Sequence, residues 1–146
     1  MSMNFIYHDG GRVEAGYQKT SRDCVVRAAA IATERPYVEI VELISKFAAL
    51  ERRGKRKRTI SHPLKGVHTT TMRKLMAYLD WVWVPTMQIG QECRVHLKAN
   101  ELPEGRLVVR VSRHATCVID GVIFDTYDPS RGGTRCVYGY FYNPHS

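Results

Sequence analysis

The residues most able to do chemistry in this chain lie at the start of an apolar segment. Gln18 is followed six positions later by Cys24, and Cys24 leads directly into the apolar run 25–32. Such a run is typical of a buried helix, and Ser21 as its N-cap with Asp23 as an early carboxylate places Cys24 in the first turn. The positive end of a helix favours the thiolate, the nucleophilic form of cysteine. Cys24 is therefore a candidate nucleophile, and the alternative is a structural thiol packed in the core.

A cysteine nucleophile needs a base, and the chain offers His114 at the start of a predicted strand. Asp120-Gly121 is a strong signal for a two-residue hairpin turn. In the register of that turn Asp125 lies diagonally next to His114, because side chains alternate between the two faces of a sheet. Asp125 can then orient the imidazole ring. Asp128 faces away unless a bulge shifts the register by one residue, and it is the alternative third member.

The pattern of apolar residues divides the chain into helices followed by strands. Helical spacing predicts three helices, over 22–33, 36–52 and 70–79. Residues 1–20 look extended and rich in loops. Alternating or β-branched residues predict strands over 81–85, 107–112, 114–119, 122–128 and 135–142. Helices followed by an antiparallel sheet form an α+β arrangement, and 146 residues suit one domain, 1–146.

The net charge of +8 comes mainly from one short segment. Six of the 22 basic residues lie within 52–58, and without them 16 basic residues stand against 14 acidic ones. A charge run of this kind is typical of a solvated loop between two helices. It could also hold an acidic partner or the phosphates of a nucleic acid, with a strong dependence on salt.

The cysteines and the N-terminus bear on the compartment. Residues 1–8 contain neither the charged nor the apolar region of a secretory signal, and no apolar stretch is long enough to cross a membrane. We therefore expect a cytoplasmic protein without a membrane partner, in the host cytoplasm if it is phage-encoded. Cys24, Cys93, Cys117 and Cys136 are predicted to be reduced thiols, with Cys117 in the core. Without a CxxC motif or a Cys/His cluster, we expect no metal site and no cofactor.

Taken together, these residues resemble the papain-like cysteine peptidases. They are most similar in pattern to small bacterial and phage relatives that include the bacteriocin-leader peptidases of ABC exporters. That group carries Gln, four variable residues, an acidic residue and then Cys, which corresponds here to Gln18 and to Asp23-Cys24. The family's His begins a strand, as His114 does. Its Asn-Ser-Trp segment on the paired strand looks like 125–127, Asp-Thr-Tyr, in this chain.

The resemblance implies a fold and a role for each residue. It implies a papain-like α+β domain in which the nucleophile helix packs on a C-terminal antiparallel sheet. Cys24 is then the nucleophile, His114 the base and later the acid, and Asp125 the residue that orients His114. Gln18 donates to the oxyanion together with the backbone N–H of Cys24, and Tyr127 lies beside the pair.

Two positions depart from the family's pattern. Leader peptidases often place their acid in an Asp-Pro pair, and Asp128-Pro129 is such a pair, so Asp128 stays open as the third member. The residue after the nucleophile is often Gly or another small residue in the family, whereas Val25 stands there in this chain.

The sequence predicts a cysteine hydrolase that cleaves a peptide or isopeptide bond in a peptide or protein substrate. The cleavage passes through an acyl-enzyme on Cys24. A deamidase, a transglutaminase-like acyltransferase or a cell-wall amidase could use the same residues, because fold and triad do not determine the acyl donor. The alternative is a phage-encoded, non-catalytic binding protein on the same scaffold. It would hold an acidic protein or a nucleic acid through the basic run 52–58.

Overall fold

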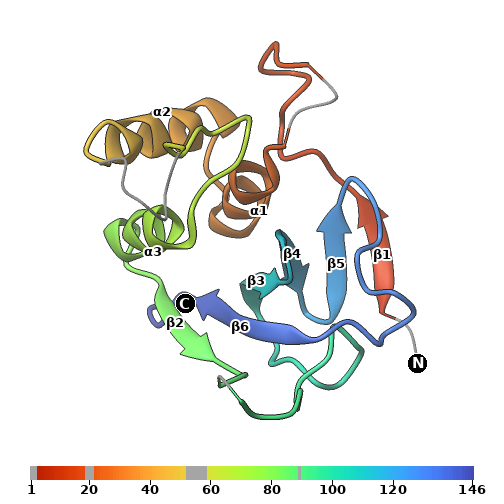
Figure 1. Ribbon diagram of the computed structural model, residues 1–146. Helices are drawn as coiled ribbons and strands as arrows, with labels where there is room; N and C mark the ends of the chain where they lie inside the picture. The colour runs from red at the N-terminus through yellow and green to blue at the C-terminus, as the bar shows by residue number, and fades with distance from the viewer. Residues whose placement is uncertain (1–2, 19–21, 52–58, 89) are drawn as a thin grey trace.

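The structure, a computed structural model, describes residues 3–18, 22–51, 59–88 and 90–146. The basic run 52–58 and the proposed N-cap Ser21 lie outside the described residues. Within them, three helices and six strands form an α+β fold (Figure 1). The helices are α1 (Cys24–Thr33), α2 (Tyr37–Ala48) and α3 (Thr69–Tyr78). The strands are β1 (Asn4–Tyr7), β2 (Val82–Pro85), β3 (Arg106–Val111), β4 (His114–Ile119), β5 (Val122–Asp125) and β6 (Val137–Tyr142).

The six strands form one mixed sheet in the order β1-β5-β4-β3-β6-β2. All neighbours are antiparallel except β1 and β5, which run parallel with Asn4 opposite Val122. The prediction of a purely antiparallel sheet was therefore wrong at this edge. Residues 4–7 are all exposed and show no apolar alternation. A parallel pair of strands is also not joined by a local turn that could be recognised in the sequence.

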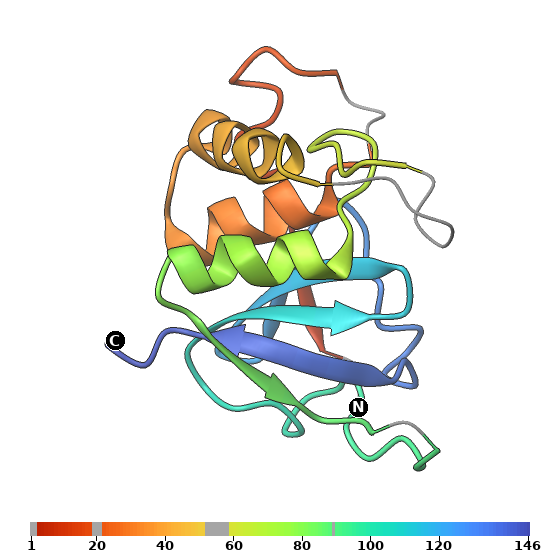
Figure 2. The same ribbon diagram turned by 60° about the vertical axis from the view of Figure 1, so that its left-hand side comes forward.

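The helices cover one face of the sheet, and α1 lies against the sheet itself (Figure 2). The apolar residues of α1 are buried from Val25 to Ala32, and they share one core with α2, α3, Ala115 and Cys117. A second cluster fills the other face, where Leu97 packs against strand residues such as Val118 and Ile123. Alternation along β4 thus supplies both cores, because neighbouring side chains point to opposite faces.

Hydrogen bonds from β3 fix the C-terminal end of α1 against the sheet. At its C-terminal end, Glu34 adopts a left-handed conformation and ends the helix, and Arg106 of β3 donates hydrogen bonds to the carbonyls of Ile31 and Ala32. A guanidinium at this end complements the helix dipole. The N-terminal end of α1, which carries Cys24, lies where β4 begins and β5 ends.

Two tight turns bring the functional strands into register. Ile119 pairs with Val122, so Asp120-Gly121 is the predicted two-residue turn, and both of its residues have positive φ. Val111 pairs with His114, which makes Ser112-Arg113 a second turn of the same length. Because β4 and β5 are antiparallel neighbours, the first residue of β4 and the last residue of β5 meet at one end of the sheet.

Candidate active site

Cys24 is the first residue of α1, and its thiol is half-buried. Asp23 occupies the N-cap position, but its side chain makes no capping hydrogen bond to the helix. The prediction that Asp23 lies within the first turn was therefore wrong. Asp23 comes immediately before the helix, and Cys24 is the first residue of the first turn. The backbone N–H of Ala115, on β4, donates to the Cys24 sulfur. The thiol therefore lies between the positive end of a helix and a backbone donor of the sheet.

His114 connects Cys24 to Asp125. It is the first residue of β4 and is buried, and its Nε2 lies 2.7 Å from Oδ2 of Asp125. Its ring also interacts with the Cys24 thiol. Since Asp125 occupies Nε2, Nδ1 is the nitrogen left for the sulfur. This geometry agrees with the predicted juxtaposition of the three side chains.

Cys24 and His114 each shift the pKa of the other. Burial of Cys24 raises its pKa, but the neighbouring His114, the Ala115 N–H and Arg27 together lower it below that of an ordinary thiol. Burial of His114 lowers its pKa, but hydrogen bonds and charge interactions with Asp125 and Cys24 raise it to about 9. Both shifts favour a thiolate beside an imidazolium near neutral pH.

Asp125 is the last residue of β5 and is buried. Its Oδ1 accepts from the backbone N–H of Thr126 at 2.7 Å and lies 3.3 Å from Nη2 of Arg27. Burial raises the pKa of this carboxyl, but His114, the Thr116 hydroxyl and the Thr126 N–H lower it overall. His8, the residue directly after β1, donates its N–H to the Asp125 carbonyl at 2.8 Å and so ties the end of that strand to Asp125.

Asp128, the alternative third member, does not face His114. It is exposed, and its Oδ1 accepts from the N–H of Ser130 at 2.9 Å, as expected of an Asp in a turn. Tyr127 lies beside the imidazole, with ring centroids 5.1 Å apart. The geometry thus favours Asp125 over Asp128 and agrees with the position predicted for Tyr127.

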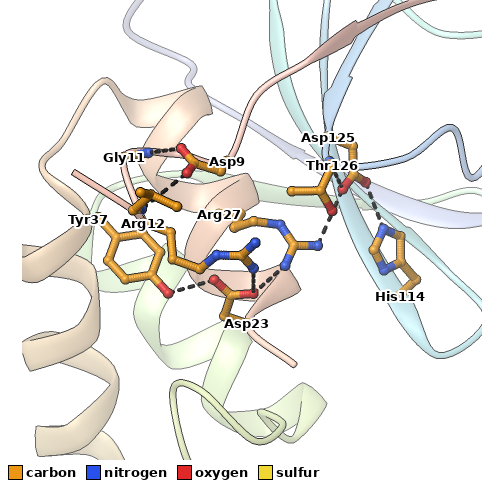
Figure 3. Close-up of polar contacts among 10 residues, drawn as sticks. Asp9, Gly11, Arg12, Asp23, Arg27, Tyr37, His114, Asp125 and Thr126 are labelled. Atoms are coloured by element: carbon orange, nitrogen blue, oxygen red, sulfur yellow. Dashed lines mark hydrogen bonds and ion pairs between the residues drawn. The ribbon is translucent and has the colours of Figure 1, made fainter. Parts of the chain in front are cut away.

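A second buried carboxylate, Asp23, extends the network beyond the three predicted residues (Figure 3). It is fully buried and is bound by Arg27, by Arg12 at 2.9 Å and by the Tyr37 hydroxyl at 2.5 Å. Arg27 therefore lies between Asp23 and Asp125 and pairs with both. Burial and the hydrogen bond to Asp23 raise the pKa of Tyr37, so the hydroxyl keeps its proton. The sequence interpretation missed this network. Its only signal was one charge, Arg27, inside an otherwise apolar helix and four residues after Asp23.

A cavity of about 590 Å³ opens onto the candidate triad. Cys24, His114 and Tyr127 line it together with Val25 of α1, the bulky residue that departs from the family's pattern. Its remaining walls are the segment 65–69 and several basic side chains of α1, β3 and the β3–β4 turn.

Gln18 is not among the residues that line this cavity. It is exposed and lines a neighbouring hollow with Tyr17 and Leu64. The structure therefore does not bring Gln18 together with Cys24 and His114, and the described geometry gives no support to its predicted role as oxyanion donor. The N-terminal end of α1, which Cys24 begins, has the polarity that an oxyanion would need.

The other three cysteines differ from Cys24. Cys117 is buried on the helix-facing side of β4, and burial raises its pKa to about 12, which agrees with the predicted core thiol. Cys93 and Cys136 form a disulfide with their Cα atoms 5.8 Å apart, so the prediction that all four are reduced thiols was wrong for this pair. An isolated β-bridge between His96 and Cys136 brings together two segments that are far apart in the sequence, and no local sequence motif predicts this contact.

Comparisons with known protein families, curated proteins and solved structures find no match for this chain. Among the described residues, no group of three His, Cys, Asp or Glu side chains is placed to hold a metal ion. No helix within the same residues has both the length and the apolar character needed to span a bilayer.

Proposed function

We propose that this protein is a cysteine hydrolase that cleaves a peptide or isopeptide bond through an acyl-enzyme on Cys24. The observation that carries the proposal is the position of His114, which interacts with the Cys24 thiol on one side and with the Asp125 carboxylate, 2.7 Å away, on the other. A structural thiol needs neither partner. Both shifts in pKa favour the reactive ion pair over the neutral pair.

The proposed reaction has two steps. The Cys24 thiolate attacks the carbonyl carbon, so that a C–S bond forms, the C–N bond breaks, and the imidazolium of His114 gives its proton to the leaving amine. Neutral His114 then takes a proton from water while the oxygen attacks the thioester. A C–O bond forms, the C–S bond breaks, and the carboxylic acid leaves. Asp125 keeps the ring oriented and stabilises its charged form.

The arrangement of elements supports a papain-like architecture for this enzyme. Cys24, the proposed nucleophile, is the first residue of α1. His114, the proposed base, is the first residue of β4, and Asp125, the carboxylate that orients it, is the last residue of the neighbouring β5. The positive end of α1 would stabilise the oxyanion formed on the carbonyl oxygen.

Mapping of thiol reactivity by mass spectrometry tests the nucleophile, with Cys117 as an internal control. Iodoacetamide at pH 6 should label Cys24 rapidly and leave Cys117 of the native protein unlabelled, because Cys117 is buried and protonated. His114→Ala should slow the labelling of Cys24 at pH 6 by at least about tenfold. Equal, slow labelling of Cys24 in both proteins would overturn the proposal.

Turnover tests the reaction itself. A mixture of internally quenched fluorescent peptides of varied sequence should be cleaved by the native protein and not by Cys24→Ala. A covalent adduct with a peptide aldehyde or vinyl sulfone at Cys24 would give the same result by an independent route. If Cys24 is reactive but neither cleavage nor an adduct is detected, the hydrolase proposal fails.

A further inference from the structure

The cavity at Cys24 lies in the middle of three connected hollows. The hollow beside Gln18, about 600 Å³, shares Arg22 and Lys65 with the Cys24 cavity. A third hollow of about 550 Å³ shares Arg113 and Tyr127 with the Cys24 cavity. Because they share lining residues, the three hollows adjoin one another, and we describe them together as one groove, which offers more room than a small molecule would need.

Basic side chains dominate this groove, and we call the following six residues the cationic groove: Arg22, Lys65, Arg110, Arg113, Arg131 and Arg135. None of the six forms an ion pair with a carboxylate of the described residues. The acidic residue that lines the groove, Asp128, binds the N–H of Ser130. The groove around Cys24 therefore carries an excess of positive charge over the carboxylates of the described residues.

Arg110 is the cation most closely tied to the nucleophile. It lies on β3 opposite Ala115, the residue whose N–H donates to Cys24, and it is half-buried. Its guanidinium contacts the sulfur of Met72 at 3.8 Å and reaches no carboxylate. Burial lowers the pKa of Arg110, and the charge of Cys24 offsets this only in part.

Arg27 shows how the same fold treats a structural arginine. Its buried guanidinium is matched by the carboxylates of Asp23 and Asp125. A guanidinium taken partly out of water without such a partner is costly to the folded state, and a carboxylate supplied from outside would stabilise it.

On the basis of the proposed function, we infer that the substrate is an acidic polypeptide segment, whose carboxylates bind the cationic groove beside the bond that Cys24 attacks. A polypeptide fits better than a nucleic acid, because the thiolate and imidazolium act on acyl carbons. Among the described residues that line the groove, the tyrosines are Tyr17 beside Gln18 and Tyr127 beside Cys24, and no hollow holds both, so the groove lacks the adjacent tyrosine rings on which successive bases would stack.

A pair of reagents that differ in charge tests the local part of this inference. Iodoacetate and iodoacetamide both alkylate a thiolate by forming a C–S bond and releasing iodide, but only iodoacetate is an anion. Their rate ratio at Cys24, divided by the ratio for N-acetylcysteine, reports the potential at the sulfur. We expect about a tenfold preference for iodoacetate at low ionic strength, and a smaller one at 0.5 M NaCl.

Matched variants assign this preference to the groove. Arg110→Gln and Arg113→Gln should each reduce the preference, and Arg110→Lys should keep most of it because the charge is retained. Arg35→Gln is the control. Arg35 lies beyond the far end of α1 and pairs with Glu39 on the surface, so the same loss of charge there should leave the ratio unchanged.

Protection of Cys24 from iodoacetamide tests whether the groove binds an acidic polypeptide. The probes are a ten-residue peptide of mixed Glu and Ala, its counterpart with Lys in place of Glu, and a ten-nucleotide oligo-dT. The acidic peptide should slow labelling of native Cys24 in a saturable way, and much less so in Arg110→Gln, whereas the Lys peptide should have no effect.

The outcomes separate this inference from the proposed function. Reactive Cys24 without a preference for iodoacetate overturns the inference and leaves the hydrolase intact. If the oligonucleotide protects Cys24 more strongly than the acidic peptide does, the inference of a polypeptide substrate is overturned, and the result favours a nucleic acid as the ligand of the groove. Cys24 that reacts slowly with both reagents overturns the proposed function and the inference together.

Discussion

His114 is the residue on which the chemistry of the candidate site depends, because it contacts both other members of the triad. Asp125 binds one ring nitrogen, and the ring has a pKa of about 9 through its interactions with Asp125 and Cys24, despite its burial. Since that pKa is raised above the value in the unfolded chain, the charged ring stabilises the fold below about pH 6.5 and loses this effect as the pH rises through 9.

The pH dependence of turnover follows from the same pair. We expect kcat/KM for a cleaved peptide to be level near neutral pH and to fall above about pH 9, where His114 loses the proton that the leaving amine needs. The acid limb should lie below the pKa of an ordinary thiol, because the pKa of Cys24 is lowered. A profile that rises steadily from pH 7 to 10 would instead indicate an ordinary thiol without an imidazolium partner.

The choice between two carboxylates is also decided at this scale. Asp125→Asn should reduce kcat/KM by about 100-fold or more, because His114 would lose the partner that determines its tautomer and orientation. Asp128→Asn is the matched comparison, and it should not lower kcat/KM, since Asp128 is exposed and its carboxylate binds the N–H of Ser130 in a turn. The reverse ranking would show that Asp128 is the carboxylate that orients His114.

Among the elements, α1 is the one whose placement determines the site, and buried charges determine that placement. Asp23 immediately before the helix binds Arg12, Arg27 and Tyr37, while Arg106 binds the carbonyls at the opposite end. Gly10 lies against the backbone of α1 at Arg27, where an added Cβ would meet the Cα atom of Arg27 at 3.0 Å. The network and this close contact together hold the N-terminal end of α1 at the sheet.

Two ion pairs with the same helical spacing allow a matched test of this network. Asp23 and Arg27 are buried, whereas Arg35 and Glu39 are exposed. Asp23→Asn should lower the free energy of unfolding by about 3–5 kcal/mol, because it leaves buried guanidinium groups without their carboxylate. Glu39→Gln should lower it by about 0.5 kcal/mol or less. Urea denaturation measures both, and equal effects would show that Asp23 does not hold α1.

The elements differ in how well the sequence predicts them, and the reason is the range of the interactions that form them. The hairpin at Asp120-Gly121 depends on local turn geometry, so its register and the position of Asp125 beside His114 could be predicted. β1 forms through a parallel pair with β5, which no local pattern indicates. The predicted ends of α2 and β5 lie several residues beyond the observed ones, because apolar periodicity continues past the last backbone hydrogen bonds of an element.

At the scale of the whole molecule, the disulfide between Cys93 and Cys136 joins the loop after β2 to the start of β6. It closes a loop of 43 residues, so replacing both cysteines by serine should lower the free energy of unfolding by about 2–4 kcal/mol. The labelling rate of Cys24 in the folded variant should stay unchanged, because neither cysteine lines its cavity. If dithiothreitol has no effect on the unfolding of the native protein, the two thiols are reduced, as the sequence alone predicted.

The candidate site as a whole was only partly accessible from the sequence. Cys24, His114 and Asp125 could be identified because each has a local signal, namely a helix start, a strand start and a hairpin register. The partners of Asp23 and the charge of the groove could not be identified from the sequence. Arg12 and Arg27 meet at Asp23, and Arg110 reaches the same cavity as Arg27, only through contacts between elements of the folded chain.

The separation of Cys24 from its partners along the chain has a consequence for synthesis. Cys24 leaves the ribosome long before His114 and Asp125, and β1 has no strand to pair with until β5 has been made. An incomplete chain therefore carries an ordinary thiol, which is almost fully protonated at pH 6. Under the proposed function, Cys24 becomes a reactive nucleophile only when both halves of the chain have assembled, and an unfinished chain lacks that reactivity. The rate at which Cys24 is alkylated at pH 6 is thus a direct measure of the fraction of chains that have finished folding.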